Sequence, residues 1–259
     1  MSDDFRTLSL TAARAGASAI DRVLDAGPVD PVFKSGHHDM VTAADRASEA
    51  AVVKVIRAAR PDDPILGEEG GSLPGTTDVQ WLIDPLDGTA NFVYGRADYA
   101  ISVGVRVAGD PHAGAIVRPA HKQWVAGGPD GVITGRVHGP ARVTLTPDPP
   151  AELARALVAI GMPYDLAARR RVLAFAAELA ESVRGIRVMG SAAGDLASVV
   201  LGECDAVVGF GLAEWDVAAG EAIVLAAGGA VRRFISALDL PAMASGPADL
   251  VDALASLAG

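Results

Sequence analysis

The middle of the chain, residues 99–146, consists of short apolar and β-branched runs separated by Gly, Pro and Asp. These runs are ISVGVRV, AGAIV, QWVA, GVIT and ARVTL. Alternating runs of this length, bounded by turn residues, are typical of neighbouring strands in an antiparallel sheet. Because helical patterns lie on both sides of this region, the chain is predicted to have an α+β fold.

Helical patterns occupy four segments. Apolar periodicity, caps and terminating glycines place these helices at residues 3–26, 42–60, 191–202 and 215–227. Thr42 and Asp45 have the spacing of a capping box, and Ser191 is a candidate N-cap. The runs PILGEE and QWLIDPLDG are predicted to be buried strands that deliver acidic side chains at their carboxyl ends. A further short strand is predicted at residues 205–208.

A proline-rich stretch, residues 147–150, is the best candidate for a boundary within the chain. It separates an N-terminal α+β half, residues 1–146, from a C-terminal α/β half, residues 147–259. The predicted antiparallel sheet belongs to the first half.

Composition excludes several classes of protein. The chain has 32 acidic and 22 basic residues, a net charge of −10, which argues against a nucleic-acid binder or a polybasic membrane anchor. The single cysteine, Cys204, excludes an intrachain disulfide and a cysteine-rich metal site. The acidic start MSDDFRTLSL is unlike a secretion signal, and no apolar run has the length of a membrane span. We therefore expect a cytoplasmic protein.

The hexapeptide Asp84-Pro85-Leu86-Asp87-Gly88-Thr89 is the strongest local feature. Two carboxylates lie three residues apart at a strand-to-turn junction that Pro85 stiffens, and a helix can begin directly after the turn. Mg²⁺ prefers carboxylate oxygens held in a rigid arrangement, whereas a helix N-terminus offers N–H groups to a phosphate. The hexapeptide is therefore predicted to hold Mg²⁺ together with a phosphate, although an ordinary Asx turn would use the same residues.

Other acidic positions have ordinary structural explanations when each is taken alone. Glu68 lies in the loop GEEG, Asp216 stands in the first turn of a predicted helix, and Asp45 fits a capping box. The sequence lacks the motifs of other phosphate-processing enzymes: it has no Asp-x-Asp, no Cys-x5-Arg and no P-loop. It also lacks a Gly-x-Ser-x-Gly elbow.

Taken together, these segments resemble the inositol monophosphatase family of Mg²⁺-dependent, lithium-sensitive phosphatases. WLIDPLDGTANF is similar to the first signature of that family, EWDVAAGEAIVLAAGG to the second, and GEEG to its upstream acidic motif. The resemblance implies a layered α-β-α-β-α sandwich, a homodimer, and two or three Mg²⁺ ions in each active site. The first half would then carry most of the metal site, and the second half would complete it.

The resemblance also implies roles for individual residues. The metal ligands would be Glu68, Asp84, the Leu86 carbonyl, Asp87 and Asp216. Glu68, Thr89 and Asp45 would be catalytic, with Thr89 and Asp45 orienting the attacking water. The backbone N–H groups of Gly88 and Thr89 would bind the phosphate. The substrate would contact Asp87, Gly190, Ser191, Ala192, Gly209 and Asp216.

One position departs from the family pattern. Inositol-specific members carry a glutamate seven residues before the aspartate of the second signature, and here that position is Gly209. The wall of the pocket for the alcohol is therefore expected to be wider or less polar than in those members, which puts inositol itself in question.

The predicted activity is that of a phosphoric monoester hydrolase acting on a small phosphorylated polyol through metal-activated water. Inositol monophosphate is the first substrate to consider, because GSAAGDLA resembles the inositol and sugar-phosphate branch. The alternatives are histidinol phosphate, a sugar bisphosphate, or a nucleotide-like phosphate such as adenosine 3′,5′-bisphosphate. A phosphatase that has lost its activity and serves as a binding protein is a further alternative.

Overall fold

The computed structural model describes residues 5–27, 29–33, 40–136 and 152–259. The α-helices in this part of the chain are α1 (Phe5–Ala26), α2 (Ala43–Ala59), α3 (Thr89–Val93), α4 (Leu166–Ala180), α5 (Ala192–Val200), α6 (Glu214–Ala226) and α7 (Ala248–Ala258). A 3₁₀ helix, η1, spans Leu153–Arg155. None of the described helices combines the length and the apolar character needed to cross a membrane.

The strands form three sheets. A two-stranded ribbon pairs β1 (Val32–Phe33) with β2 (Met40–Val41). A seven-stranded sheet contains β4 (Gly71–Leu73), β3 (Ile65–Gly67), β5 (Val79–Asp87), β6 (Ala100–Val107), β7 (Asp110–Arg118), β8 (Gln123–Gly128) and β9 (Gly131–Arg136), in that order. A five-stranded sheet contains β11 (Gly185–Arg187), β10 (Leu157–Gly161), β12 (Ala206–Phe210), β14 (Pro241–Gly246) and β13 (Ala230–Ile235), in that order.

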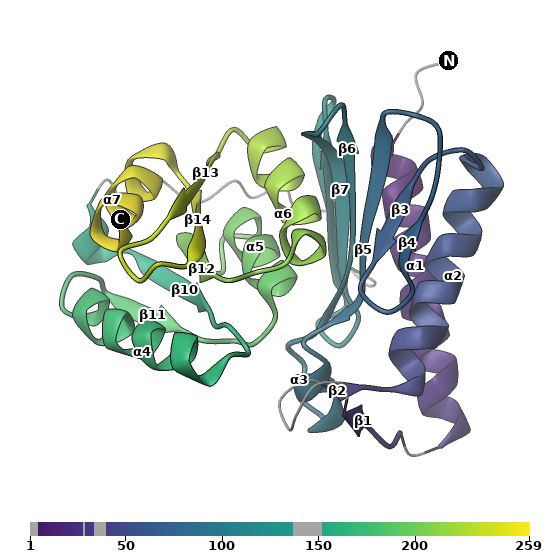
Figure 1. Cartoon of the computed structure of the whole chain (residues 1–259), viewed down its shortest axis with the longest axis horizontal. Coiled ribbons are helices and arrows are strands. Elements are labelled where there is room, and N and C mark those ends of the chain that lie inside the picture. The colour runs from purple at the N-terminus through teal and green to yellow at the C-terminus, as the bar shows by residue number, and fades with distance from the viewer. Residues whose placement is uncertain (1–4, 28, 34–39, 137–151) are drawn as a thin grey trace.

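The elements stack in five layers (Figure 1). Helices α1 and α2 cover the outer face of the seven-stranded sheet, and α4 and α7 cover the outer face of the five-stranded sheet. Helices α5 and α6 lie between the two sheets and pack against both. The predicted layered α-β-α-β-α sandwich is therefore confirmed.

The antiparallel sheet predicted for the middle of the chain is present. Strands β5 to β9 pair in sequence order, each antiparallel to the next. Strand β3 extends this sheet by pairing parallel to β5, with Gly67 opposite Ile83. The run ARVTL and the predicted boundary at 146/147 lie outside the described residues, so the division into two halves stays a prediction.

The predicted helix starts hold with small shifts. Thr42 caps α2 in a capping box with Asp45, and the Ser191 side chain accepts the Gly194 N–H at the start of α5. Helix α6 begins at Glu214, one residue before the predicted start, because the Asp216 side chain accepts a hydrogen bond from the N–H of Ala213. Residues 3–4 of the first predicted helix lie outside the described residues.

Helix α6 lies unusually close to the seven-stranded sheet. A Cβ atom on Gly104 of β6 would be 2.6 Å from the backbone nitrogen of Ala219, and one on Gly114 of β7 would be 2.6 Å from the Ala219 Cα atom. Such distances are far shorter than van der Waals contact, so glycine at both positions allows this approach. The Ser102 hydroxyl also donates to the carbonyl of Trp215 at 3.3 Å, which joins β6 to the first turn of α6.

Candidate active site

Asp84 lies in β5 where the strand becomes irregular. The regular pairing of β5 with β6 ends at Asp84 opposite Ser102, and the register shifts between Asp84 and Asp87. Asp84 is buried, and its Oδ1 accepts the Leu86 N–H at 3.1 Å. Burial raises the pKa of Asp84 well above its usual value, and the negative charges of Glu68, Asp87 and Asp216 raise it further.

Glu68 follows β3, the strand that pairs with β5. Its N–H donates to the carbonyl of Ile83 at 3.1 Å, which holds the residue beside Asp84. The buried carboxylate of Glu49 on α2 accepts the next N–H, that of Glu69, at 3.0 Å. Glu49 was not predicted from the sequence, where it appears only as one acidic residue of a helix.

Asp216 comes from the other side of the site, in the first turn of α6. Its Oδ2 accepts the N–H of Ala213 at 2.8 Å, in agreement with the predicted role of an acid at a helix start. Burial raises the pKa of Asp216 to about 8, with the negative charges of Asp87 and Glu68 as further causes. Four carboxylates, one directly after β3, two on β5 and one on α6, therefore lie close enough together for their negative charges to act on one another.

Asp87 connects the hexapeptide to α5. Its Oδ2 accepts the Ser191 hydroxyl and the Ala193 N–H, both at 2.7 Å. Burial raises the pKa of Asp87, while the hydrogen bonds from Ser191 and from the first turn of α5 act in the opposite direction. Asp87 is thus placed at the start of α5 as well as beside Asp84.

Thr89 and Asp45 lie in contact, as the resemblance implied. The Thr89 hydroxyl is 3.0 Å from Asp45 Oδ1 and 2.9 Å from the carbonyl oxygen of Leu86, so it can donate its single hydrogen to either. The other oxygen of Asp45 accepts the N–H and the hydroxyl of Thr42 at 2.7 and 2.6 Å. Asp45 therefore serves as a helix cap and as a partner of Thr89, and its burial raises its pKa.

Gly88 stands between Asp87 and the short helix α3. Its backbone is left-handed, with φ of 85°, and a Cβ atom there would approach the carbonyl oxygen of Asp98 to 2.8 Å. Glycine is thus required at this turn, which places the N–H groups of Gly88 and Thr89 at the start of α3.

The residues expected to face the alcohol lie on two segments. Gly190, Ser191 and Ala192 follow one another at the start of α5. A Cβ atom on Gly190 would be 3.1 Å from the Asn91 side-chain nitrogen on α3, and this side chain donates to the carbonyl oxygens of Met189 and Asp98, both at 2.7 Å. Gly209 lies in β12, opposite Gly161 of β10. A Cβ atom on Gly209 would be 2.3 Å from Leu212 Cδ1, so Leu212 already occupies that space. An apolar side chain therefore fills the space beside Gly209, and the expectation that Gly209 faces the alcohol stays a prediction.

Tyr164 is a residue near the site that sequence reasoning missed. It lies in the loop between β10 and α4 and is 64% exposed. Partial burial raises the pKa of the Tyr164 hydroxyl, and the negative charges of Asp87 and Glu68 raise it further. Only an aromatic residue in a loop marks this position in the sequence, and that signal is too common to single it out.

The carboxylates suit a divalent cation by their charge. Within the described residues, no group of three or more His, Cys, Asp or Glu side chains has the geometry of a formed metal site. The carboxylate oxygens instead accept hydrogen bonds from Leu86, Ser191, Ala193 and Ala213. Four mutually repelling carboxylates nevertheless fit Mg²⁺, because a hard cation with oxygen ligands would relieve the repulsion.

Comparison with known families agrees with this geometry. A model of the inositol monophosphatase family matches residues 2–246. The chain belongs to the inositol monophosphatase family. As a member of this family it is a phosphoric monoester hydrolase, which confirms the predicted class of enzyme.

Among individual relatives, the inositol-1-monophosphatase SuhB of Mycobacterium tuberculosis is 37% identical over 203 residues, 76% of this chain and 70% of that protein. The Nus factor SuhB of Haemophilus influenzae is 34% identical over 229 residues, 88% of this chain and 84% of that protein. The structure of inositol monophosphatase from Anabaena superposes with a TM-score of 0.81 at 30% identity, covering 98% of this chain and 94% of that chain.

Proposed function

We propose that this member of the inositol monophosphatase family is a Mg²⁺-dependent phosphomonoesterase for a small phosphorylated alcohol. The observation that carries the proposal is the group of four carboxylates, Glu68, Asp84, Asp87 and Asp216, which come from three separate segments of the chain. Their negative charges raise the pKa values of Asp84 and Asp216. Close packing of four acidic side chains is unfavourable because their negative charges repel. We therefore infer that a bound cation compensates these charges in the active enzyme.

In this proposal, Glu68, Asp84, Asp87, Asp216 and the Leu86 carbonyl hold two or three Mg²⁺ ions. Bound Mg²⁺ lowers the pKa of a water molecule and neutralises charge on the phosphate. Acidic ligands and a negatively charged substrate would otherwise repel each other, which explains why no reaction is expected without the metal.

Thr89 and Asp45 supply a path for the proton of the attacking water. The Thr89 hydroxyl can accept a proton from water as it gives its own to Asp45 Oδ1, 3.0 Å away. The raised pKa of Asp45 makes this carboxylate a better proton acceptor. The oxygen of this water then bonds to phosphorus as the ester bond to the alcohol breaks. The departing alkoxide takes a proton from a second water molecule, and the hydroxide left behind is neutralised by the proton that Asp45 received, so Asp45 returns to its starting state.

The phosphate would lie against the N–H groups of Gly88 and Thr89, with the alcohol directed toward Ser191, Ala192 and Gly209. Inositol monophosphate is one candidate, since the relative from Mycobacterium tuberculosis is named an inositol-1-monophosphatase. Histidinol phosphate, a sugar bisphosphate and a nucleotide-like phosphate are the others. We also propose a homodimer in the cytoplasm, on the family resemblance and the acidic, cysteine-poor composition.

The test is hydrolysis of a panel of phosphomonoesters with Mg²⁺ and with EDTA. We expect turnover with Mg²⁺ and none with EDTA. Asp62→Asn changes an exposed aspartate after α2. This control variant is expected to behave like the wild type, with turnover in Mg²⁺ and none in EDTA. Turnover that survives EDTA would refute the metal requirement.

Some relatives are named Nus factors, which supports one competing function: a binding protein without catalysis. The same panel of phosphomonoesters distinguishes the phosphatase from the binding protein. A chain that hydrolyses none of the phosphomonoesters, but is still stabilised by Mg²⁺, would favour the binding protein.

A further inference from the structure

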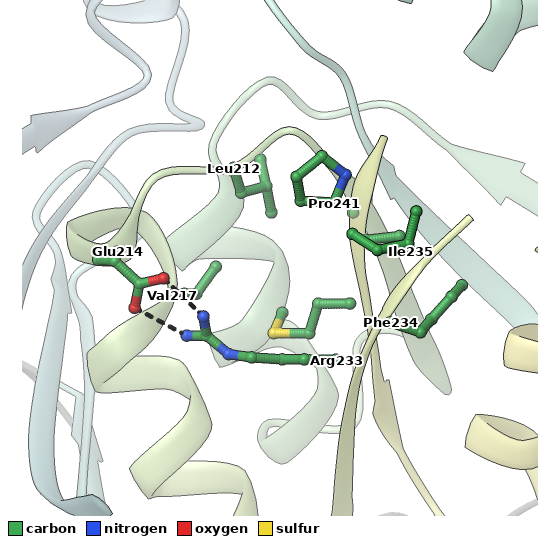
Figure 2. Close-up of a pocket in the computed structure, with 10 residues that line it drawn as sticks. Leu212, Glu214, Val217, Arg233, Phe234, Ile235 and Pro241 are labelled. Atoms are coloured by element: carbon green, nitrogen blue, oxygen red, sulfur yellow. Dashed lines mark hydrogen bonds and ion pairs between the residues drawn. The ribbon is translucent and has the colours of Figure 1, made fainter. Parts of the chain in front are cut away.

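A cavity of about 340 Å³ lies between the first turn of α6 and strands β12, β13 and β14, and Figure 2 shows the ion pair of Glu214 with Arg233 among its lining residues. None of the four carboxylates of the proposed active site lines this cavity. The contacts that hold these carboxylates in place therefore lie elsewhere, and helix α2 supplies several of them.

Helix α2 directs three buried polar side chains toward the proposed active site. Ser48 and Glu49 follow Asp45 by three and four residues, so the three side chains lie on one face of the helix. Asp45 Oδ1 is 3.0 Å from the hydroxyl of Thr89, and the Ser48 hydroxyl donates to the carbonyl of Pro85 at 2.7 Å. Two members of this face thus hold the hexapeptide that carries two of the four carboxylates.

Glu49, the third member, contacts the segment that carries Glu68. The Glu49 side chain is buried, and its Oε2 accepts the N–H of Glu69 at 3.0 Å. A Cβ atom on Gly67 would be 2.5 Å from Oε2, and one on Gly70 would come closer still to Oε1. Both oxygens of Glu49 therefore lie against the backbone of residues 67–70.

The two glycines are needed for space and not for their backbone conformation. Neither Gly67 nor Gly70 has the left-handed φ that favours glycine, so alanine could adopt the backbone of either residue. Its methyl group, however, would occupy the place of the Glu49 carboxylate. The loop and the Glu49 side chain thus fit each other closely.

Glu68 lies between the residues that Glu49 contacts. Its N–H donates to the carbonyl of Ile83 on β5 at 3.1 Å, and the next N–H donates to Glu49 on α2. The negative charges of Glu68 and Asp84 act on each other in the metal-free protein, so a loosely held loop would move Glu68 away from Asp84. The bond to Glu49 opposes this movement.

We propose that Glu49 is a positioning residue of the metal site: through the N–H of Glu69 it holds the loop in place, so that Glu68 stays beside Asp84 and both can bind Mg²⁺. The inference rests on the proposed Mg²⁺-dependent activity and deepens it, because it assigns part of the Mg²⁺ affinity to a residue outside the ligand set. Since Glu49 acts through Glu68, its loss should raise the Mg²⁺ concentration that the site needs. A site saturated with Mg²⁺ should retain most of its kcat.

The first test measures Mg²⁺ binding by calorimetry in the absence of substrate. Glu49→Ala removes the acceptor of the Glu69 N–H, and loss of a group that orients a metal ligand typically reduces metal affinity about 10–100-fold. We therefore expect the Kd for Mg²⁺ to rise about tenfold or more. Glu49→Gln keeps the size of the side chain and an oxygen for this N–H, so its Kd should stay close to that of the wild type.

Val52→Ala is the matched control, because Val52 is buried on the same helix and packs toward Gly16 of α1. It should lower the Tm in EDTA, as Glu49→Ala does, without changing the Kd for Mg²⁺. An unchanged Kd in Glu49→Ala, or an equal rise in Val52→Ala, would show that Glu49 only stabilises the fold and would overturn the inference. A Kd in Glu49→Gln as high as in Glu49→Ala would also overturn it, because the charge of Glu49 and not its hydrogen bond would then matter.

The second test is a double-mutant cycle between Glu49 and Gly70. Gly70→Ala should weaken Mg²⁺ binding in the wild type, because the added methyl group displaces the Glu49 carboxylate. In the Glu49→Ala background the same change should have little further effect, since the carboxylate is absent. Gly185→Ala is the control: its Cβ atom would be 3.6 Å from the nearest atom, an ordinary contact. Additive losses of affinity in the double variant would count against the coupling.

Kinetics with a phosphomonoester then separates this inference from the proposed activity. Glu49→Ala should need about tenfold more Mg²⁺ for half-maximal turnover, while its kcat at saturating Mg²⁺ stays near that of the wild type. If the wild type hydrolyses no phosphomonoester but calorimetry gives the expected pattern, the phosphatase fails and the role of Glu49 stands. If the wild type is active and Glu49→Ala binds Mg²⁺ equally well, the phosphatase stands and the role of Glu49 fails. A wild type that binds no Mg²⁺ would refute both.

Discussion

The Ser191 hydroxyl donates to Asp87 Oδ2 at 2.7 Å, and this bond joins residues that are 104 positions apart. The N–H of Ala193 donates to the same oxygen, so the start of α5 is fixed on the hexapeptide of β5. Helix α5, which lies between the two sheets, is thereby joined to the seven-stranded sheet at Asp87. The group of four carboxylates is complete only when the helical layer that holds α5 and α6 is packed against this sheet.

Ser191→Ala should destabilise the protein. The substitution removes the donor to Asp87 and the acceptor of the Gly194 N–H, and each loss costs about 1 kcal/mol in comparable cases. Urea denaturation in the absence of metal should therefore show a loss of roughly 1–3 kcal/mol. Ser72→Ala, at an exposed position in β4, is the control; an equal loss there would show that the bond contributes nothing specific.

Asp84→Asn should abolish the activity of the Mg²⁺-loaded enzyme. Loss of a central metal ligand removes several kcal/mol of transition-state stabilisation, so we expect a decrease in kcat of about 10³-fold or more. Steady-state kinetics with saturating Mg²⁺ measures the change. Near-wild-type turnover by this variant would refute the assignment of Asp84 as a metal ligand.

The same substitution should stabilise the metal-free protein. An asparagine oxygen can still accept the Leu86 N–H, while the repulsion from Glu68, Asp87 and Asp216 disappears. Thermal unfolding in EDTA should therefore give a higher Tm for Asp84→Asn than for the wild type, and added Mg²⁺ should raise it less. If the variant instead unfolds at a lower temperature than the wild type in EDTA, groups of the folded protein already compensate the negative charge of Asp84 without a metal.

The stability of the metal-free protein should fall as the pH rises from about 4 to 8. The pKa of Asp216 is about 8 in the folded state, above the ordinary value of 3.8, so the folded state binds more protons than the unfolded state within this window. The free energy of unfolding then decreases with pH, and the raised pKa of Asp84 acts in the same direction. Measurement of Tm in EDTA between pH 5 and 8.5 tests this, and Asp216→Asn should reduce the slope. A Tm that rises steadily across this range would contradict it.

Much of the fold follows from local patterns. The alternating runs of residues 101–134 become β6 to β9 because each run has turn residues on both sides. Thr42 and Ser191 begin helices as predicted, since their side chains satisfy N–H groups that a helix start leaves free. The hexapeptide of β5 could be identified because metal and phosphate chemistry require these residue types close together in sequence.

Other features depend on segments that are distant in sequence. The role of Glu49 depends on a contact with Glu69, and the ion pairs of Arg233 depend on how β13 packs against α6. Leu212 fills the space beside Gly209 through a turn of the backbone that no local pattern specifies. Such contacts arise only when the layers pack, which a single sequence does not reveal.

The close approach of α6 to Gly104 and Gly114 has a consequence for genetic screens. An added methyl group at either glycine would push α6 outward and carry Asp216 away from Asp84, although no charge or functional group would change. Random mutagenesis should therefore recover inactive alleles at these two glycines as readily as at the acidic residues. The glycine alleles would regain activity at high Mg²⁺ concentrations, whereas Asp84→Asn would not.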